Sequence, residues 1–147
     1  MSSDLTLIEF FMQDHRDCDE RWVEVENAIE GGDPTTIQTS WETFDRLQRH
    51  HLDMEEQVMF PAFEEATGMT SGPTMMMRME HDQMRGLLEQ MAGVMQGGDF
   101  QGVLDLGDTL LMLVQQHNQK EEGMLYPMAN SALAADWEAL KEKLEKL

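Results

Sequence analysis

The chain has 147 residues, the size of one ordinary domain, and 41% of them are hydrophobic, which is enough for a packed core. Its 29 acidic and 10 basic residues give a formal net charge of -19, so we expect no nucleic-acid partner and no membrane partner, because both are bound mainly through Lys and Arg. A single cysteine excludes an internal disulfide and a cysteine-rich zinc site. The N-terminus lacks a basic segment followed by an apolar run, and no stretch reaches the ~20 apolar residues of a membrane span. We therefore expect no signal peptide and a cytoplasmic location.

Three turn signals divide the chain into pieces of helical length. The first is Gly31-Gly32-Asp33-Pro34, in which glycine suits the end of a helix, aspartate the N-cap of the next, and proline its first turn. The second lies between Thr67 and Pro73, and the third is Gly97-Gly98-Asp99. Between these breaks the apolar residues recur every three or four positions, as on one face of a helix.

The spacing predicts long helices over about residues 4–30, 34–65, 73–96 and 100–129, and a short one over about residues 135–147. Short connections make consecutive helices antiparallel neighbours. The predicted fold is therefore all-α: an antiparallel up-down-up-down four-helix bundle with a short C-terminal fifth helix. We expect the fifth helix to lie across the bundle or to form a homodimer contact.

The two halves of the sequence match at one offset of 66 residues. This offset relates the members of three pairs, which are His15 and His81, His51 and His117, and Glu55 and Glu121. We interpret residues 1–147 as a single domain built from a duplicated helical hairpin, over about residues 5–66 and 71–129. In each hairpin the two histidines are equidistant from the turn, at Asp33 or Asp99, so antiparallel helices place them at one level.

Six side chains should therefore meet inside the bundle. A histidine and a glutamate at positions i and i+4 lie on one helical face. His51 and Glu55 should therefore both point into the bundle, as should His117 and Glu121. Burying two carboxylates without a counter-charge costs several kcal/mol each, and two divalent cations would offset that cost. Imidazole and carboxylate without thiolate suit iron, manganese or zinc. A lone inward histidine is more often an ordinary core residue, but four at one level, two of them with glutamates, favour metal ligands over this alternative.

The pattern of an isolated His followed by His-x3-Glu occurs twice, and each copy continues as Glu-x3-aromatic-Pro. It resembles the hemerythrin-like family, also called the HHE cation-binding domain, over about residues 5–129. The resemblance implies a four-helix bundle and two iron ions joined by an oxo or hydroxo bridge, with manganese or zinc still possible. It also implies a small diatomic ligand such as O2 or NO. The resemblance implies six metal ligands: His15, His51, His81 and His117 bind the metals, and Glu55 and Glu121 bridge them.

One position departs from the oxygen-carrying members of that family. They have a fifth histidine one turn after the third, where this chain has Arg85. Reversible oxygen carriage is then less favoured, and chemistry on nitric oxide or peroxide more so. The counterpart of Arg85 in the first half is Asp19. We expect Asp19 to add a carboxylate to a metal or to pair with Arg85, with solvent exposure of both as the alternative.

Several neighbouring residues allow two interpretations each. Cys18 is expected to be a buried apolar residue rather than a redox thiol. Tyr126 is expected to pack as an aromatic ring, because its counterpart is Phe60. Glu56 and Glu122 could contact the ligands or be solvated.

The function we favour is a di-iron module that binds or senses O2 or NO. The alternatives are a di-iron redox enzyme acting on nitric oxide or peroxide, and iron storage or delivery.

Overall fold

The structure is a computed structural model that describes residues 5–147, and within them every regular element is helical. The elements follow in the order α1 (Leu7–Gly31), α2 (Pro34–Met54), α3 (Phe60–Thr67), α4 (Pro73–Gln96), α5 (Phe100–Lys120), α6 (Tyr126–Ala132) and α7 (Trp137–Lys146). Two π-helical turns, Glu55–Met59 and Glu121–Leu125, join α2 to α3 and α5 to α6. A 3₁₀ turn, Ala134–Asp136, precedes α7. The predicted all-α fold is confirmed.

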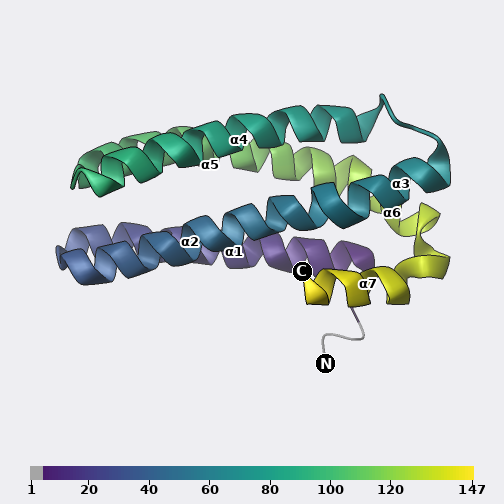
Figure 1. Ribbon diagram of the computed structural model, residues 1–147, viewed down its shortest axis with the longest axis horizontal. Coiled ribbons are helices and arrows are strands. Elements are labelled where there is room, and N and C mark those ends of the chain that lie inside the picture. Colours follow the sequence, from purple (N-terminus) through teal and green to yellow (C-terminus); the bar gives the residue numbers. More distant parts are fainter. Residues whose placement is uncertain (1–4) are drawn as a thin grey trace.

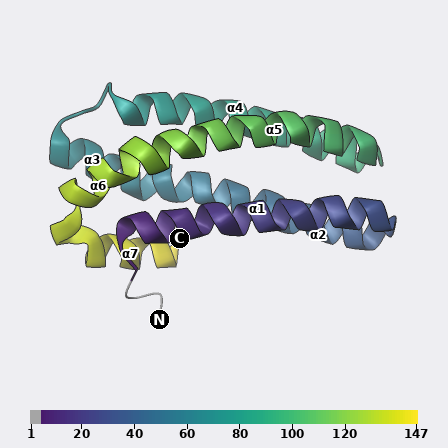
Figure 2. The same ribbon diagram turned by 180° about the vertical axis from the view of Figure 1, so that it is seen from behind.

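The long helices form two antiparallel hairpins that lie against each other (Figure 1). Helices α1 and α2 make one hairpin, and α4 and α5 make the other, with both hairpin turns at the same end of the bundle. The view from behind shows the same two layers (Figure 2). Helix α7 lies on the outside of the first hairpin near the other end and packs on its own bundle, beside the π turn Glu55–Met59, which fits the first of the two arrangements expected for it.

The hairpin turns use the residues expected of them. Gly32 ends α1 with a φ of 80°, a left-handed conformation that glycine adopts without a side-chain clash. The Asp33 side chain then accepts a hydrogen bond from the Thr36 amide, and Pro34 opens α2. Asp99 caps α5 in the same way through the Gly102 amide. At the start of the chain the N-cap is Thr6, and Asp4, where the sequence suggested that the helix begins, lies outside the described residues.

The two π turns interrupt helices that the sequence predicted to be continuous. In each, an amide bonds back five residues instead of four: Phe60 to the carbonyl of Glu55, and Tyr126 to that of Glu121. The next residue is proline in both cases, which has no N–H and whose ring would collide with the carbonyl four residues back in a regular α-helix. A wider turn relieves that collision and changes the direction of the helix. Both turns begin at a glutamate that the sequence singled out.

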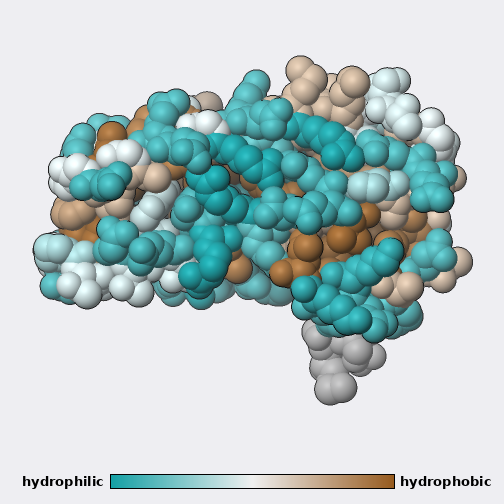
Figure 3. All heavy atoms as spheres, in the orientation of Figure 1, coloured by the Kyte–Doolittle hydropathy of each residue, from teal (hydrophilic) through white to brown (hydrophobic). Residues whose placement is uncertain are grey.

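Two apolar clusters fill the bundle on either side of its middle. One lies toward the hairpin turns and includes Trp22, Phe44 and Leu88, while the other lies toward α7 and includes Phe11 and Phe60. Figure 3 shows apolar surface beside α7, where a groove runs between α3 and α7. No helix of the described residues is both long and apolar enough to cross a membrane. The polar layer between the two clusters is where the predicted site lies.

Candidate metal centre

The bundle brings the six predicted side chains together in its middle. His15 comes from α1, His51 from α2, His81 from α4 and His117 from α5, while Glu55 and Glu121 begin the two π turns. All six are buried, and both glutamates are completely shielded from solvent.

Their donor atoms form two groups of four, and within each group the atoms lie within 4.8 Å of one another. The first group is His15, His51, Glu55 and Glu121; the second is His81, His117, Glu55 and Glu121. Each group thus draws three residues from one hairpin and a glutamate from the other.

Each glutamate reaches histidines of both groups, Glu121 with its two oxygens and Glu55 with one. Glu121 Oε1 lies 3.1 Å from His15 Nε2, and its Oε2 lies 3.1 Å from His117 Nε2. Glu55 Oε1 lies 3.1 Å from His81 Nε2 and 3.6 Å from His51 Nε2. This is the disposition of carboxylates that bridge two neighbouring cations.

Each of the four histidines in the two donor groups uses its other ring nitrogen to donate to a carboxylate. The Nδ1 distances are 2.7 Å from His51 to Asp14, 2.7 Å from His15 to Glu122, 2.6 Å from His81 to Glu56, and 2.8 Å from His117 to Glu80. These hydrogen bonds fix the tautomer, so that all four Nε2 atoms face the centre, and they make the imidazoles more basic. The arrangement is typical of histidines that ligate metals.

Two of these four carboxylates were missed in the sequence. Asp14 and Glu80 immediately precede the isolated histidines and are themselves 66 residues apart, as are Glu56 and Glu122. A search for acidic residues that recur at the offset of 66, and not for ligands alone, would have found Asp14 and Glu80. Of the two alternatives left open for Glu56 and Glu122, the structure shows contact: they accept from His81 and His15.

Protons balance the buried charge in the metal-free chain. Burial alone would lower the pKa of His81, but the adjacent carboxylates of Glu55 and Glu56 outweigh it and raise the pKa to about 9. The pKa values of His15 and His117 are raised for the same reason. Burial would raise the pKa of Glu121, yet the imidazoles of His117 and His15, each 3.1 Å from one of its oxygens, hold that pKa well below its usual value. Around Glu121 the centre therefore holds an ionised carboxylate, and the imidazoles of His15, His81 and His117 bind protons where cations could replace them.

Three donor atoms of the centre nevertheless lack a hydrogen-bond partner. They are His51 Nε2, Glu55 Oε1 and Glu121 Oε2, all three buried. An unsatisfied buried polar atom costs roughly 1–3 kcal/mol, and more if it is charged. These three atoms lie within the two donor groups, so the nitrogen and oxygen donors present fit a pair of metal ions.

Tyr126 packs as an aromatic ring, as expected, but its hydroxyl does more. The ring stacks on Phe11 and His15. The hydroxyl donates to Glu55 Oε2 at 2.6 Å and lies 3.0 Å from both Glu121 Oε1 and His15 Nε2. Burial next to two carboxylates raises the pKa of Tyr126 well above its usual value. Its counterpart Phe60 stacks on His81 with a ring that carries no polar atom.

The two flanks of the centre also differ. Arg85 donates to Glu56 at 2.6 Å and to Asp53 at 2.9 Å, so the expected pairing of Asp19 with Arg85 is wrong. Arg85 lies beside Glu56, whereas Asp19 lies beside Glu122, the counterpart of Glu56 in the second half, so the two residues do not meet. Asp19 is outside both donor groups and borders a surface cleft that reaches His15 and Glu122.

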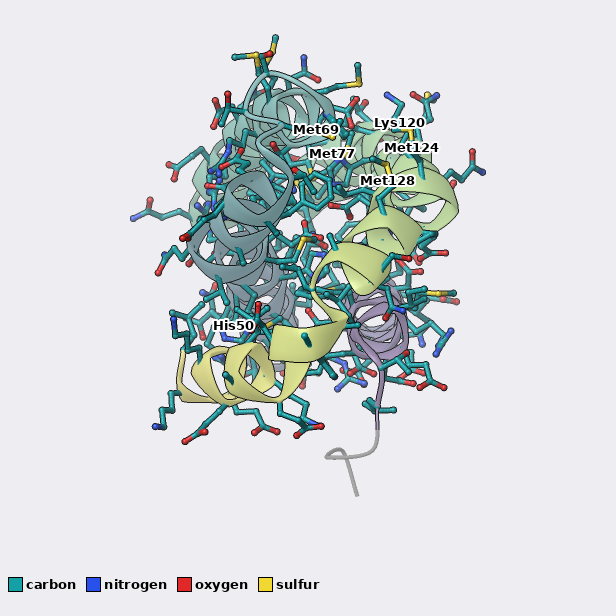
Figure 4. All side chains as sticks on the ribbon, turned by 90° about the vertical axis from the view of Figure 1, so that its right-hand side faces the viewer. His50, Met69, Met77, Lys120, Met124 and Met128 are labelled. Carbon is teal, nitrogen blue, oxygen red and sulfur yellow. The ribbon has the colours of Figure 1, made fainter. Side chains whose placement is uncertain are left out.

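Two further residues lie apart from the donors. Cys18 is buried, 3% exposed, and burial raises the pKa of its thiol, which agrees with the expected apolar packing. His50, labelled in Figure 4, belongs to neither donor group.

Comparison with known proteins agrees with this geometry. The family model described as the hemerythrin HHE cation binding domain matches residues 6–129. No curated protein and no solved structure gave a match. The match covers all six residues of the two donor groups and most of the chain. This chain belongs to the hemerythrin HHE cation-binding domain family.

Proposed function

We propose that the chain holds two iron ions between its two hairpins and binds a small diatomic molecule, O2 or NO, at that centre. His15 and His51 would hold one ion, His81 and His117 the other, and Glu55 and Glu121 would bridge them. The proposal depends on one observation: His51 Nε2, Glu55 Oε1 and Glu121 Oε2 are buried and have no hydrogen-bond partner. Two of these atoms belong to the carboxylates that are shared by both donor groups.

The protein's own contribution is to fix and shield the donors. The carboxylates on the four Nδ1 atoms keep each Nε2 lone pair directed at the centre. The apolar clusters on both sides exclude water, which strengthens electrostatic interactions within the layer. When bound, reduced iron supplies an open coordination position and electrons for a diatomic ligand.

The presence of Arg85 favours a second candidate function, chemistry on nitric oxide or peroxide, in addition to gas binding. It occupies the position of the fifth histidine of oxygen carriers, and its guanidinium is held by Glu56 and Asp53. The ion between His81 and His117 would then have two imidazoles and two carboxylate oxygens, leaving room for an added ligand. The alternative function is therefore a di-iron redox enzyme that turns over nitric oxide or peroxide.

The test begins with the chain loaded with ferrous iron without oxygen. We expect about two iron ions per chain by metal analysis, and a coupled pair by Mössbauer spectroscopy. Exposure to O2 or NO should change the absorption spectrum, and removing the gas should reverse the change. Glu55→Gln combined with Glu121→Gln should abolish binding of the pair.

The outcomes separate the candidate functions. A reversible spectrum supports gas binding, whereas steady consumption of peroxide or nitric oxide under reductant supports the enzyme. Labile iron in excess of two ions per chain would indicate storage or delivery. A chain that binds no iron in either oxidation state would refute the proposal.

A further inference from the structure

The two metal positions are not chemically equivalent, because one of them faces a phenol. Tyr126 is completely buried, and its oxygen contacts atoms from both hairpins. The three contacted atoms are Glu55 Oε2, Glu121 Oε1 and His15 Nε2. Glu55 and Glu121 belong to both donor groups, but His15 belongs to the first group alone, so the phenol oxygen lies against the position that His15 and His51 would share.

One hydroxyl hydrogen cannot satisfy these contacts together. A phenol has a single O–H to donate, and the hydrogen bond at 2.6 Å to Glu55 uses it. The contact with Glu121 then sets a phenol oxygen 3.0 Å from a carboxylate oxygen. Oxygen and nitrogen atoms gathered in this way, within a buried layer, are the surroundings that a metal ion requires.

The second donor group has no equivalent oxygen. Offset by 66 residues, Phe60 faces His81 with a ring centroid distance of 5.5 Å and an interplanar angle of 27°. A phenyl ring offers carbon alone to the position between His81 and His117. The same backbone, with a π turn before each aromatic residue, thus presents an oxygen to one position and none to the other.

We propose that the Tyr126 oxygen is a direct ligand of the iron ion held by His15 and His51. This inference rests on the proposed function, since it needs the iron pair. On binding ferric iron, the phenol O–H bond breaks, the proton passes to solvent, and the oxygen forms a bond to the metal. The first position then has one donor more than the second. The open position, and with it the place for an exogenous diatomic ligand, is assigned to the ion between His81 and His117.

The sequence makes the test unambiguous, because Tyr126 is the one tyrosine of the chain. The chain is loaded with iron, oxidised to the ferric state, and studied by visible absorption and resonance Raman spectroscopy. Tyrosinate bound to ferric iron gives a charge-transfer band and enhanced phenolate vibrations, and any such signal must come from this residue. We expect the signal in the native chain and its complete loss in Tyr126→Phe.

Tyr126→Phe is a conservative variant, since Phe60 shows that a phenyl ring suits the equivalent place. Circular dichroism and iron content, expected near two per chain, check that the variant folds and loads. If it does not fold, the native spectrum alone decides the matter. Two bound ferric ions without a tyrosinate signal would overturn this inference and leave the proposed function standing. A native chain that binds no iron would overturn both.

Discussion

Replacing Glu80 should weaken metal binding although Glu80 would not touch the metal. Its carboxylate accepts from His117 Nδ1 at 2.8 Å, and hydrogen bonds with Lys120 and His117 lower its pKa against the opposing effect of burial. A hydrogen bond to a charged group contributes roughly 1.5–3 kcal/mol, and each 1.4 kcal/mol changes a dissociation constant about tenfold. Glu80→Gln should therefore weaken binding at that position by about 10- to 100-fold, the range common for such outer partners.

The assay is a competition titration with a chromophoric chelator, using zinc so that no redox change intervenes. Asp82→Asn is the matched control, because Asp82 is an exposed carboxylate on the same helix, two residues away, outside both donor groups. It removes the same charge and should change the affinity by less than about twofold. Glu80→Ala, which loses the acceptor as well as the charge, should cost more than Glu80→Gln. Equal zinc affinities for Glu80→Gln and Asp82→Asn would refute the reasoning.

The remaining predictions concern stability and reactivity. The pKa of His81 is about 9 in the fold, against an ordinary value of 6.5, so protonated His81 stabilises the fold fully below pH 6.5 and this stabilisation is lost as the pH rises through 9. In urea titrations of the metal-free chain, the free energy of unfolding should fall by on the order of 3 kcal/mol over that range. A free energy of unfolding that does not change with pH would contradict this. Gly107→Ala should destabilise the fold by about 1–3 kcal/mol, since its Cβ would lie 2.2 Å from Trp22 Cζ2, whereas Gly86→Ala meets open space in a helix and should stabilise it by about 1 kcal/mol in thermal unfolding. Cys18 should react with a thiol reagent only in denaturant, because it is buried and its pKa is raised; rapid labelling of the native chain would count against the packing described.

Helical periodicity and turn residues predicted the fold well because each signal is local. The breaks at Gly32-Asp33 and Gly98-Asp99 are specified by a left-handed glycine and a capping aspartate, which depend on their own neighbours alone. The π turns were missed because the hydrophobic pattern does not register one extra residue in a single turn. The Glu-x3-aromatic-Pro tail was visible, but its effect on the backbone depends on a clash that spacing alone does not reveal.

The candidate site could be predicted as a set of residues but not as a network. Spacing at i and i+4, together with the offset of 66, was sufficient to group the four histidines with Glu55 and Glu121. The hydroxyl contacts of Tyr126 were not predictable, because pairing it with Phe60 emphasised the shared ring and concealed the one atom that differs. The partners of Arg85 were missed for another reason. The repeat relates equivalent positions in the two hairpins and does not say which of them touch.

The matching hairpins, joined in one polypeptide, permit a division of labour between the two ends of the metal layer. Two separate identical hairpins would have to carry the same residue at both aromatic positions and the same residue at both positions beyond the isolated histidines. A continuous chain is free of that constraint. At equivalent positions of its two halves, this chain has Phe60 and Tyr126, and Asp19 and Arg85. One end can thus be specialised for holding an ion firmly, while the other keeps space for a visiting molecule.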